Sequence, residues 1–73
     1  MQGEVLIGQL TYIDSEEGQI QIMDRADGQV TALDIDAHTR LPASYGWESL
    51  VGEDVEAVAI DGRVKSISLL AQE

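Results

Sequence analysis

Few side chains in this sequence are of types that carry out chemistry. His38 is the single histidine, and there is no cysteine. A lone histidine where a strand ends is typical of a polar loop residue, and without cysteine no thiolate nucleophile, disulfide or thiolate metal site can form. No serine stands in a Gly-x-Ser-x-Gly context, the turn that presents a hydrolase nucleophile; the five are Ser15, Ser44, Ser49, Ser66 and Ser68. The sequence therefore predicts no catalytic residue and no enzyme.

The acidic residues gather at turns rather than in a ligand pattern. They occur at 14–17 (Asp-Ser-Glu-Glu) and at 24–28 (Asp-Arg-Ala-Asp-Gly). A calcium loop needs several oxygens converging on one ion, and neither stretch has the alternation of an EF-hand. Asp and Gly suit tight turns, which explains both stretches. We therefore expect no metal site and no cofactor, and a small-ligand or divalent-metal-binding barrel that uses these turns is the alternative function.

The charge balance excludes whole classes of partner. Fourteen acidic residues face four basic ones, so the formal net charge is −10. Phosphate backbones are bound through Lys and Arg, and the four here are scattered along the chain: Arg25, Arg40, Arg63 and Lys65. We therefore expect no nucleic-acid binding, which makes a nucleic-acid-binding OB domain only a second alternative.

Membrane and export signals are also missing from the sequence. No apolar run approaches the ~18 residues of a membrane-spanning helix, so no membrane partner is expected. The first four residues, Met-Gln-Gly-Glu, lack the basic residues and apolar core of a signal peptide. These features favour a cytoplasmic protein, although the mature fragment of an exported protein would show the same pattern.

The three aromatic residues form the candidate interaction surface. Tyr12 lies in a predicted strand, whereas Tyr45 and Trp47 lie in an irregular segment between Pro42 and Gly52. A small barrel loses core contacts if its ends stay open. We therefore predict that Trp47 is mostly buried and closes one end of the barrel, packed on Leu41 and Leu50. The rival interpretation makes Trp47 an exposed anchor for a partner.

Hydrophobic alternation and turn residues predict five strands. The first three cover 4–14, 19–24 and 29–36, and two more flank Asp61-Gly62 within 50–70, because an Asp-Gly pair between apolar runs is a strong hairpin signal. Gly8 inside the first run predicts a bulge or a sharp bend. Ser44 could cap a short helical turn that ends at Leu50.

The hairpins can be given a register from their turns. A two-residue turn at Asp27-Gly28 places Ile22 opposite Leu33 and Ile20 opposite Ile35. In the last hairpin, a strict two-residue turn places Val58 opposite Lys65 and Ile60 opposite Arg63. A bulge, which we favour, places Val58 opposite Val64 and Val55 opposite Ile67. Both faces of that hairpin carry apolar groups, so one face is expected to be covered by a loop or a partner. A protein partner or a homo-oligomer formed through a sheet edge is therefore the predicted kind of assembly.

These elements predict an all-β fold in one domain, residues 1–73. Three strands, a short helical or irregular plug between strands 3 and 4, and two further strands give the order of a five-stranded OB-like barrel. An SH3-like barrel is the alternative, and an Sm-like barrel would usually begin with a helix that is missing here.

Spaced motifs along most of the chain resemble a bacterial family of small β-barrel domains of unknown function, often found in tandem in exported proteins. They are Gly8-x-Leu10-x-x-Ile13-Asp14, Ile20-x-Ile22, Gly28, Leu33-x-Ile35, Thr39-Arg40-Leu41, Leu50-Val51-Gly52-Glu53-Asp54-Val55 and Ile67. The resemblance implies the barrel fold and no catalytic residue. The last hairpin is also faintly similar to small oxyanion-binding barrels, but the net charge disfavours an anion site. The sequence thus predicts a non-enzymatic accessory or protein-interaction domain.

Overall fold

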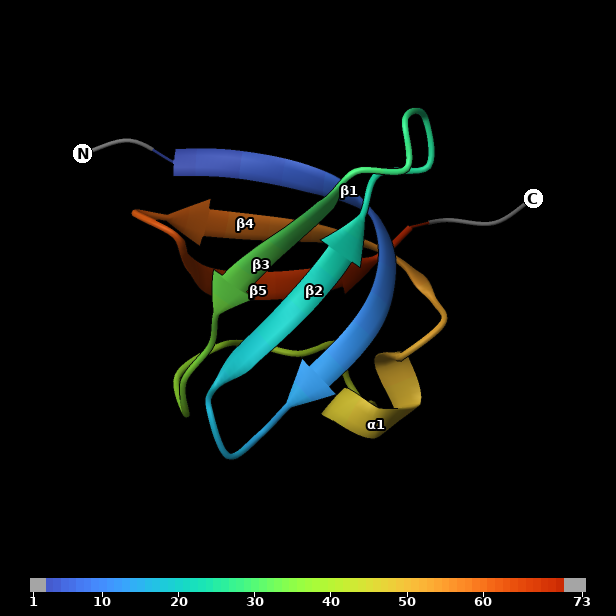
Figure 1. Ribbon diagram of the computed structural model, residues 1–73. Coiled ribbons are helices and arrows are strands. Elements are labelled where there is room, and N and C mark those ends of the chain that lie inside the picture. The colour runs from blue at the N-terminus through green and yellow to red at the C-terminus, as the bar shows by residue number, and fades with distance from the viewer. Residues whose placement is uncertain (1–2, 71–73) are drawn as a thin grey trace.

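The computed structural model describes residues 3–70. Five strands close into a ring with the order β1-β2-β3-β5-β4, and one short helix lies between the third and fourth strands (Figure 1). The elements are β1 (Gly3–Asp14), β2 (Gln19–Met23), β3 (Val30–Asp34), α1 (Trp47–Leu50), β4 (Asp54–Ile60) and β5 (Arg63–Leu69). This arrangement confirms the predicted all-β, five-stranded OB-like barrel with a short plug.

The long first strand serves two neighbours. Residues 3–9 pair with β4 and residues 9–14 pair with β2, so β1 curves around the barrel (Figure 1). Gly8 lies where the two ladders meet, and a Cβ added there would stand 2.2 Å from the carbonyl oxygen of Met23. The bulge itself falls between Leu10 and Tyr12. Gly8 is therefore required by the close approach of β2, and the predicted bulge occurs a few residues later.

The register predicted for the β2–β3 hairpin is wrong by two residues. Ile20 lies opposite Leu33, and Ile22 lies opposite Thr31. The reason is a longer turn: the amide of Asp24 donates to the carbonyl of Gln29 (2.8 Å), and the amide of Gly28 donates to the carbonyl of Asp24 (2.7 Å). Because side chains alternate with a period of two, this shift leaves the same residues facing the core.

The β4–β5 hairpin turns at the predicted Asp61-Gly62 pair. Both residues have positive φ, 54° and 79°, as a two-residue hairpin turn of the primed type requires. The predicted bulge is present, but the pairs are different: Ala59 faces Val64 and Ala57 faces Ile67. The small alanines point into the narrow interior, where space is limited, and Val58 points outward.

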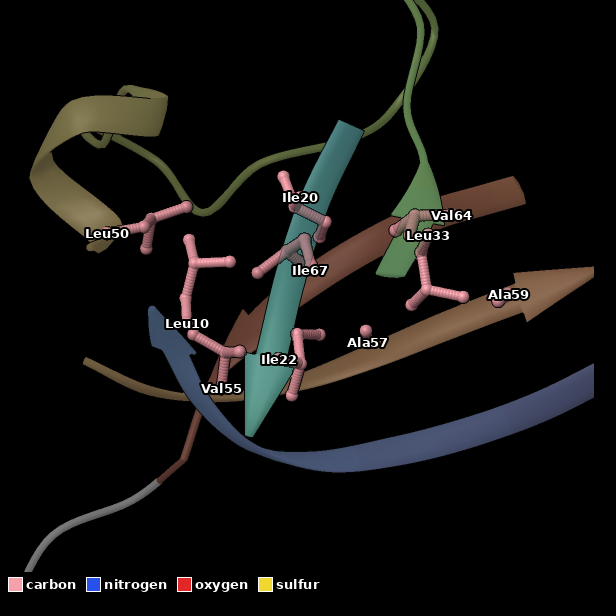
Figure 2. Packing of buried hydrophobic residues seen from close by; sticks show 10 residues of the cluster. All are labelled: Leu10, Ile20, Ile22, Leu33, Leu50, Val55, Ala57, Ala59, Val64 and Ile67. Carbon is pink, nitrogen blue, oxygen red and sulfur yellow. The ribbon is translucent and has the colours of Figure 1, made fainter. Parts of the chain in front are cut away.

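The core is apolar throughout the described residues. Ten buried side chains come from all five strands and from α1 (Figure 2), and no polar or charged side chain is buried with them. They are Leu10, Ile20, Ile22, Leu33, Leu50, Val55, Ala57, Ala59, Val64 and Ile67. Since side chains of every strand meet there, the ring is a filled barrel rather than a channel.

Leu50 closes the end of the barrel, and Trp47 packs beside the core as a second, less buried residue. Leu50 is fully buried beside Leu10 (Figure 2), and the chain that follows it is fixed because the amide of Gly52 donates to the carbonyl of Leu10 at 2.7 Å. Trp47 is part-buried and packs against the core, which agrees with the prediction that it is mostly buried; its contact with Leu41 and Leu50 stays a prediction. The aliphatic Leu50 at the end of α1 reaches deeper than the larger indole at its start.

The start of α1 also differs from the prediction. Gly46 occupies the N-cap position with extended backbone and no side-chain hydrogen bond. Ser44 instead has a positive φ of 71° in the preceding turn. The helix therefore depends on the burial of Leu50 rather than on a capping side chain. No helix formed by residues 3–70 has the length and apolar character needed to cross a membrane.

Candidate functional site

Two hollows of the surface meet at Trp47. The first, of about 250 Å³, lies between the β1–β2 turn and the chain leaving β3, and the second, of about 420 Å³, lies between β1 and α1. The β1–β2 turn, the chain leaving β3 and α1 stand at the same end of the barrel (Figure 1). Trp47 and Ser15 line both hollows. We call the two hollows together the Trp47 surface, which is formed by Ile13, Ser15, Glu16, Glu17, Gly18, Ile35, Asp36, Ala37, Gly46, Trp47, Glu48 and Ser49.

The β1–β2 turn holds two glutamates on this surface. A carboxylate oxygen of Asp14 accepts hydrogen bonds from the amides of Glu16 (3.1 Å) and Glu17 (3.0 Å). Gly18 then adopts a φ of 72°, and its carbonyl accepts a hydrogen bond from the amide of Ile35 at 2.8 Å. An Asp side chain that caps its own turn in this way fixes the backbone locally. The turn is thus bound to the chain leaving β3, and both glutamates remain exposed at the rim.

The chain leaving β3 is fixed by the carboxylate of Asp36. It accepts the amide of His38 at 2.8 Å and a guanidinium nitrogen of Arg63 at 3.3 Å. The hydrogen bond from the His38 amide, and then the charge of Arg63, lower the pKa of Asp36 below its ordinary value. Thr39 adds a bridge to β5, since its hydroxyl donates to the carbonyl of Val64 at 2.9 Å. Asp36 therefore lines the first hollow as a carboxylate that is already paired with the His38 amide and with Arg63.

The helix α1 presents the indole from the opposite side. Leu50 is buried in the core, and Trp47 lies three residues earlier in α1. The single turn of α1 therefore fixes the position of Trp47 relative to the buried Leu50. Glu48 follows directly and is exposed in the second hollow. The position of Trp47 is therefore set by the burial of Leu50.

The two hollows combine apolar walls with an acidic rim. Ile35 and Trp47 supply apolar surface in the first hollow, and Ile13 and Trp47 supply it in the second. The carboxylates are those of Glu16, Glu17, Asp36 and Glu48, and no Lys or Arg lines either hollow. Such a surface attracts a positive charge and can hold apolar groups next to it.

Of the three aromatic residues predicted for an interaction surface, only Trp47 lines these hollows. Tyr12 is 47% exposed on β1, where its hydroxyl lies 3.4 Å from a carboxylate oxygen of Asp14. Tyr45 is 36% exposed in the turn before α1. A binding role for either tyrosine remains a prediction. The sequence offered the turn at 14–17 as part of an alternative ligand site but did not link it to Trp47, because that turn and α1 lie far apart in the sequence and only barrel closure brings them together.

Within residues 3–70, the two residues that could bind a soft metal ion, Met23 and His38, are not brought together. Met23 ends β2, whereas the exposed His38 lies beyond the far end of β3. Four strand steps separate those two ends, roughly 13 Å. Nor does the described part of the chain contain a group of three His, Cys, Asp or Glu side chains placed to hold a metal ion.

A second exposed feature lies on the outside of the barrel. Val5 and Ile7 on β1 are 57% and 54% exposed, and Val5 lies opposite Val58 in the ladder with β4. The sequence predicted apolar groups on both faces of the β4–β5 hairpin; Val58 belongs to that hairpin, whereas Val5 and Ile7 on β1 were not singled out as part of an outer apolar face. Whether a partner covers this outer face remains a prediction, because a single chain is described.

No family model matches the sequence, and no curated protein matches it significantly. Solved structures do match. The barrel is similar to CusF. The crystal structure of CusF with Ag(I) superposes with a TM-score of 0.72 at 16% identity, over 96% of this chain and all of that one. A structure of Escherichia coli CusF with Ag(I) gives 0.70 at 16% identity, over 96% and 94% of the chains.

A third match is a single-residue variant of CusF from Escherichia coli with Cu(II). Its TM-score is 0.65 at 18% identity, over 96% of this chain and 94% of the other. At such identities the similarity shows the fold alone. The comparison therefore supports the OB-like barrel fold, while the site has to be argued from the residues of this chain.

Proposed function

We propose that this chain is a non-enzymatic binding barrel that takes a cationic ligand on the Trp47 surface. One observation carries the proposal: two hollows with apolar walls and acidic rims meet at the single tryptophan of the chain. A tryptophan face attracts a cation through its ring quadrupole, and nearby carboxylates add to that attraction. The net charge of −10 raises the local concentration of any cation around the molecule.

The proposal is tested with a matched pair of small probes. Methylguanidinium carries a charge, and methylurea has nearly the same shape without it. Each is titrated into ¹⁵N-labelled protein at low salt, and the amide shifts are mapped on the sequence. We expect methylguanidinium to move the amides of 15–18, 35–37 and 46–49, with little effect of methylurea. Equal shifts from both probes, or shifts spread evenly over the acidic surface, would contradict a cation site at Trp47.

A metal ion is the second candidate ligand, because the similar solved barrels carry Ag(I) and Cu(II). The residues of this chain fit that chemistry poorly: Met23 pairs with the start of β3 whereas His38 lies beyond its end, and the turn aspartates Asp14, Asp24 and Asp27 accept backbone amides. Adding Ag⁺ or Cu²⁺ to the same labelled sample separates the candidates. Saturable shifts centred on Met23 or His38 would favour a metal-binding barrel.

A further inference from the structure

We propose that the natural occupant of the Trp47 surface is a Lys or Arg side chain of a basic peptide segment, so that the barrel docks a protein partner. This inference rests on the proposed function and narrows the cationic ligand to one class. The deciding feature is the composition of each hollow: part-buried apolar side chains line it together with exposed glutamates.

The apolar walls argue for an organic cation rather than a bare ion. Ile35 and Trp47 both line the first hollow, and Ile13 and Trp47 both line the second. Lys and Arg carry three or four methylene groups that pack on apolar surface while the charged head stays at the rim. A metal ion would gain nothing from these walls, because it needs converging oxygen, nitrogen or sulfur ligands.

The rim supplies the charge that such a head requires. Glu16, Glu17 and Glu48 are exposed on two sides of Trp47. The ion pairs found within residues 3–70 engage other carboxylates, those of Asp54 and Asp36. A guanidinium at the rim can therefore reach carboxylates from the β1–β2 turn or from α1, and forked Arg donors suit such acceptors.

Two hollows that share one indole also suit a segment with more than one basic residue. A second Lys or Arg can occupy the other side of Trp47, and the backbone between them crosses the exposed edge of the ring. Two weak contacts made by one chain bind more tightly than either alone, since the second becomes intramolecular. The charge of the barrel and that of such a segment are complementary, which also speeds the encounter.

The experiment uses the peptide acetyl-Gly-Arg-Lys-Arg-Gly-amide and a neutral twin with citrulline for Arg and acetyl-lysine for Lys. Both are titrated into the labelled protein at low salt, with Trp47 fluorescence as a second readout. We expect the basic peptide to bind at least about 5-fold more tightly, to shift the amides of the Trp47 surface, and to weaken with added salt.

Substitutions locate the contacts. Trp47→Leu keeps an apolar side chain but removes the ring, and it should weaken the basic peptide roughly 2- to 5-fold. Glu16→Gln and Glu48→Gln should each weaken it to a similar degree. Glu56→Gln, on the outer face of β4 away from both hollows, removes the same charge and should leave the affinity almost unchanged. An equal loss in Glu56→Gln would overturn the site, because only net charge would then matter.

The outcomes separate this inference from the proposed function. If methylguanidinium binds at Trp47 but the neutral twin binds as tightly as the basic peptide, the inference fails and the proposed function stands. If no cation reaches the surface, both fail. Displacement of the peptide by one equivalent of Ag⁺, with shifts at the Trp47 surface, would make a metal ion the occupant and overturn the inference. Shifts centred on Val5 and Ile7 would move the docking surface to the outer face of β1, with the same consequence.

Discussion

Asp36 shows how one carboxylate can hold the chain beside the candidate site. Its pKa is lowered chiefly by the hydrogen bond from the His38 amide and also by Arg63. A carboxyl group whose pKa is lower in the folded chain stabilises that chain above its unfolded pKa. The stabilisation is lost as the pH falls through the folded value, below the ordinary 3.8.

The first prediction concerns Asp36→Asn. We expect the variant to have a smaller free energy of unfolding than the wild type at pH 7, with the gap closing as the pH falls below 3.8. Urea unfolding at several pH values measures the gap. Arg63→Gln is the control, and it should have the smaller effect because the His38 amide still donates to Asp36. A gap that stays constant into strong acid would show that charge at Asp36 is irrelevant.

The second prediction concerns the core side chains of the β2–β3 hairpin. Ile22 is 2% exposed and Leu33 is 4% exposed. Truncating either to Ala should cost about 2–4 kcal/mol, since it removes buried methyl groups and leaves a cavity. Chemical denaturation measures the loss, and Thr31→Ala, exposed opposite Ile22, is the control. Near-neutral values at both core positions would refute the described packing.

At the scale of elements, the meeting of β1 with β2 and β4 leaves no room for a side chain at Gly8. The third prediction is that Gly8→Ala destabilises the protein by about 3 kcal/mol or more, because its Cβ would collide with the backbone at Met23. A backbone atom cannot move aside as the end of a flexible side chain can. Thermal unfolding measures the effect. Gly46→Ala is the matched control, since nothing lies within 4 Å of its added Cβ, and a wild-type-like Gly8→Ala would contradict the close approach.

The elements were predictable where local signals decide them. Alternation identified all five strands, and Asp61-Gly62 gave the last hairpin its turn and its bulge. The β2–β3 register was not predictable, because Asp27-Gly28 suits a two-residue turn while hydrogen bonds between Asp24 and Gln29 close a longer loop. The prediction of which side chains face the core was still correct, since a register shift of two residues keeps the alternation of inward and outward side chains.

The candidate site was harder to predict than the fold. Trp47 was singled out and does pack on the core, but only the helix geometry shows that Leu50 is the more deeply buried of the two. The acidic partners of Trp47 come from the β1–β2 turn, which a linear motif cannot link to α1. A site assembled by ring closure thus leaves no spacing in the sequence to recognise.

At the scale of the whole molecule, the fold and the charge point to opposite kinds of ligand. OB-like barrels often bind oligonucleotides on the face of β2 and β3 and on the loops beside it. Here the outward residues of those strands include no aromatic side chain, and the β1–β2 turn carries Glu16 and Glu17. The described strands therefore offer no aromatic side chain for stacking on that face, and the nearby basic residues Arg25 and Arg63 are each paired with a carboxylate.

The fourth prediction follows from this mismatch: oligo(dT) should bind with a dissociation constant weaker than about 10 μM even at low salt, since repulsion replaces the gain from counterion release. Fluorescence anisotropy of a labelled oligonucleotide measures the affinity. The basic peptide serves as the positive control on the same preparation, because the field that repels DNA should attract the peptide. Raising the salt should weaken the peptide and leave the oligonucleotide signal flat. Tight binding of oligo(dT) that weakens steeply with salt would show that the four basic residues act together, and would return the barrel to the nucleic-acid-binding class.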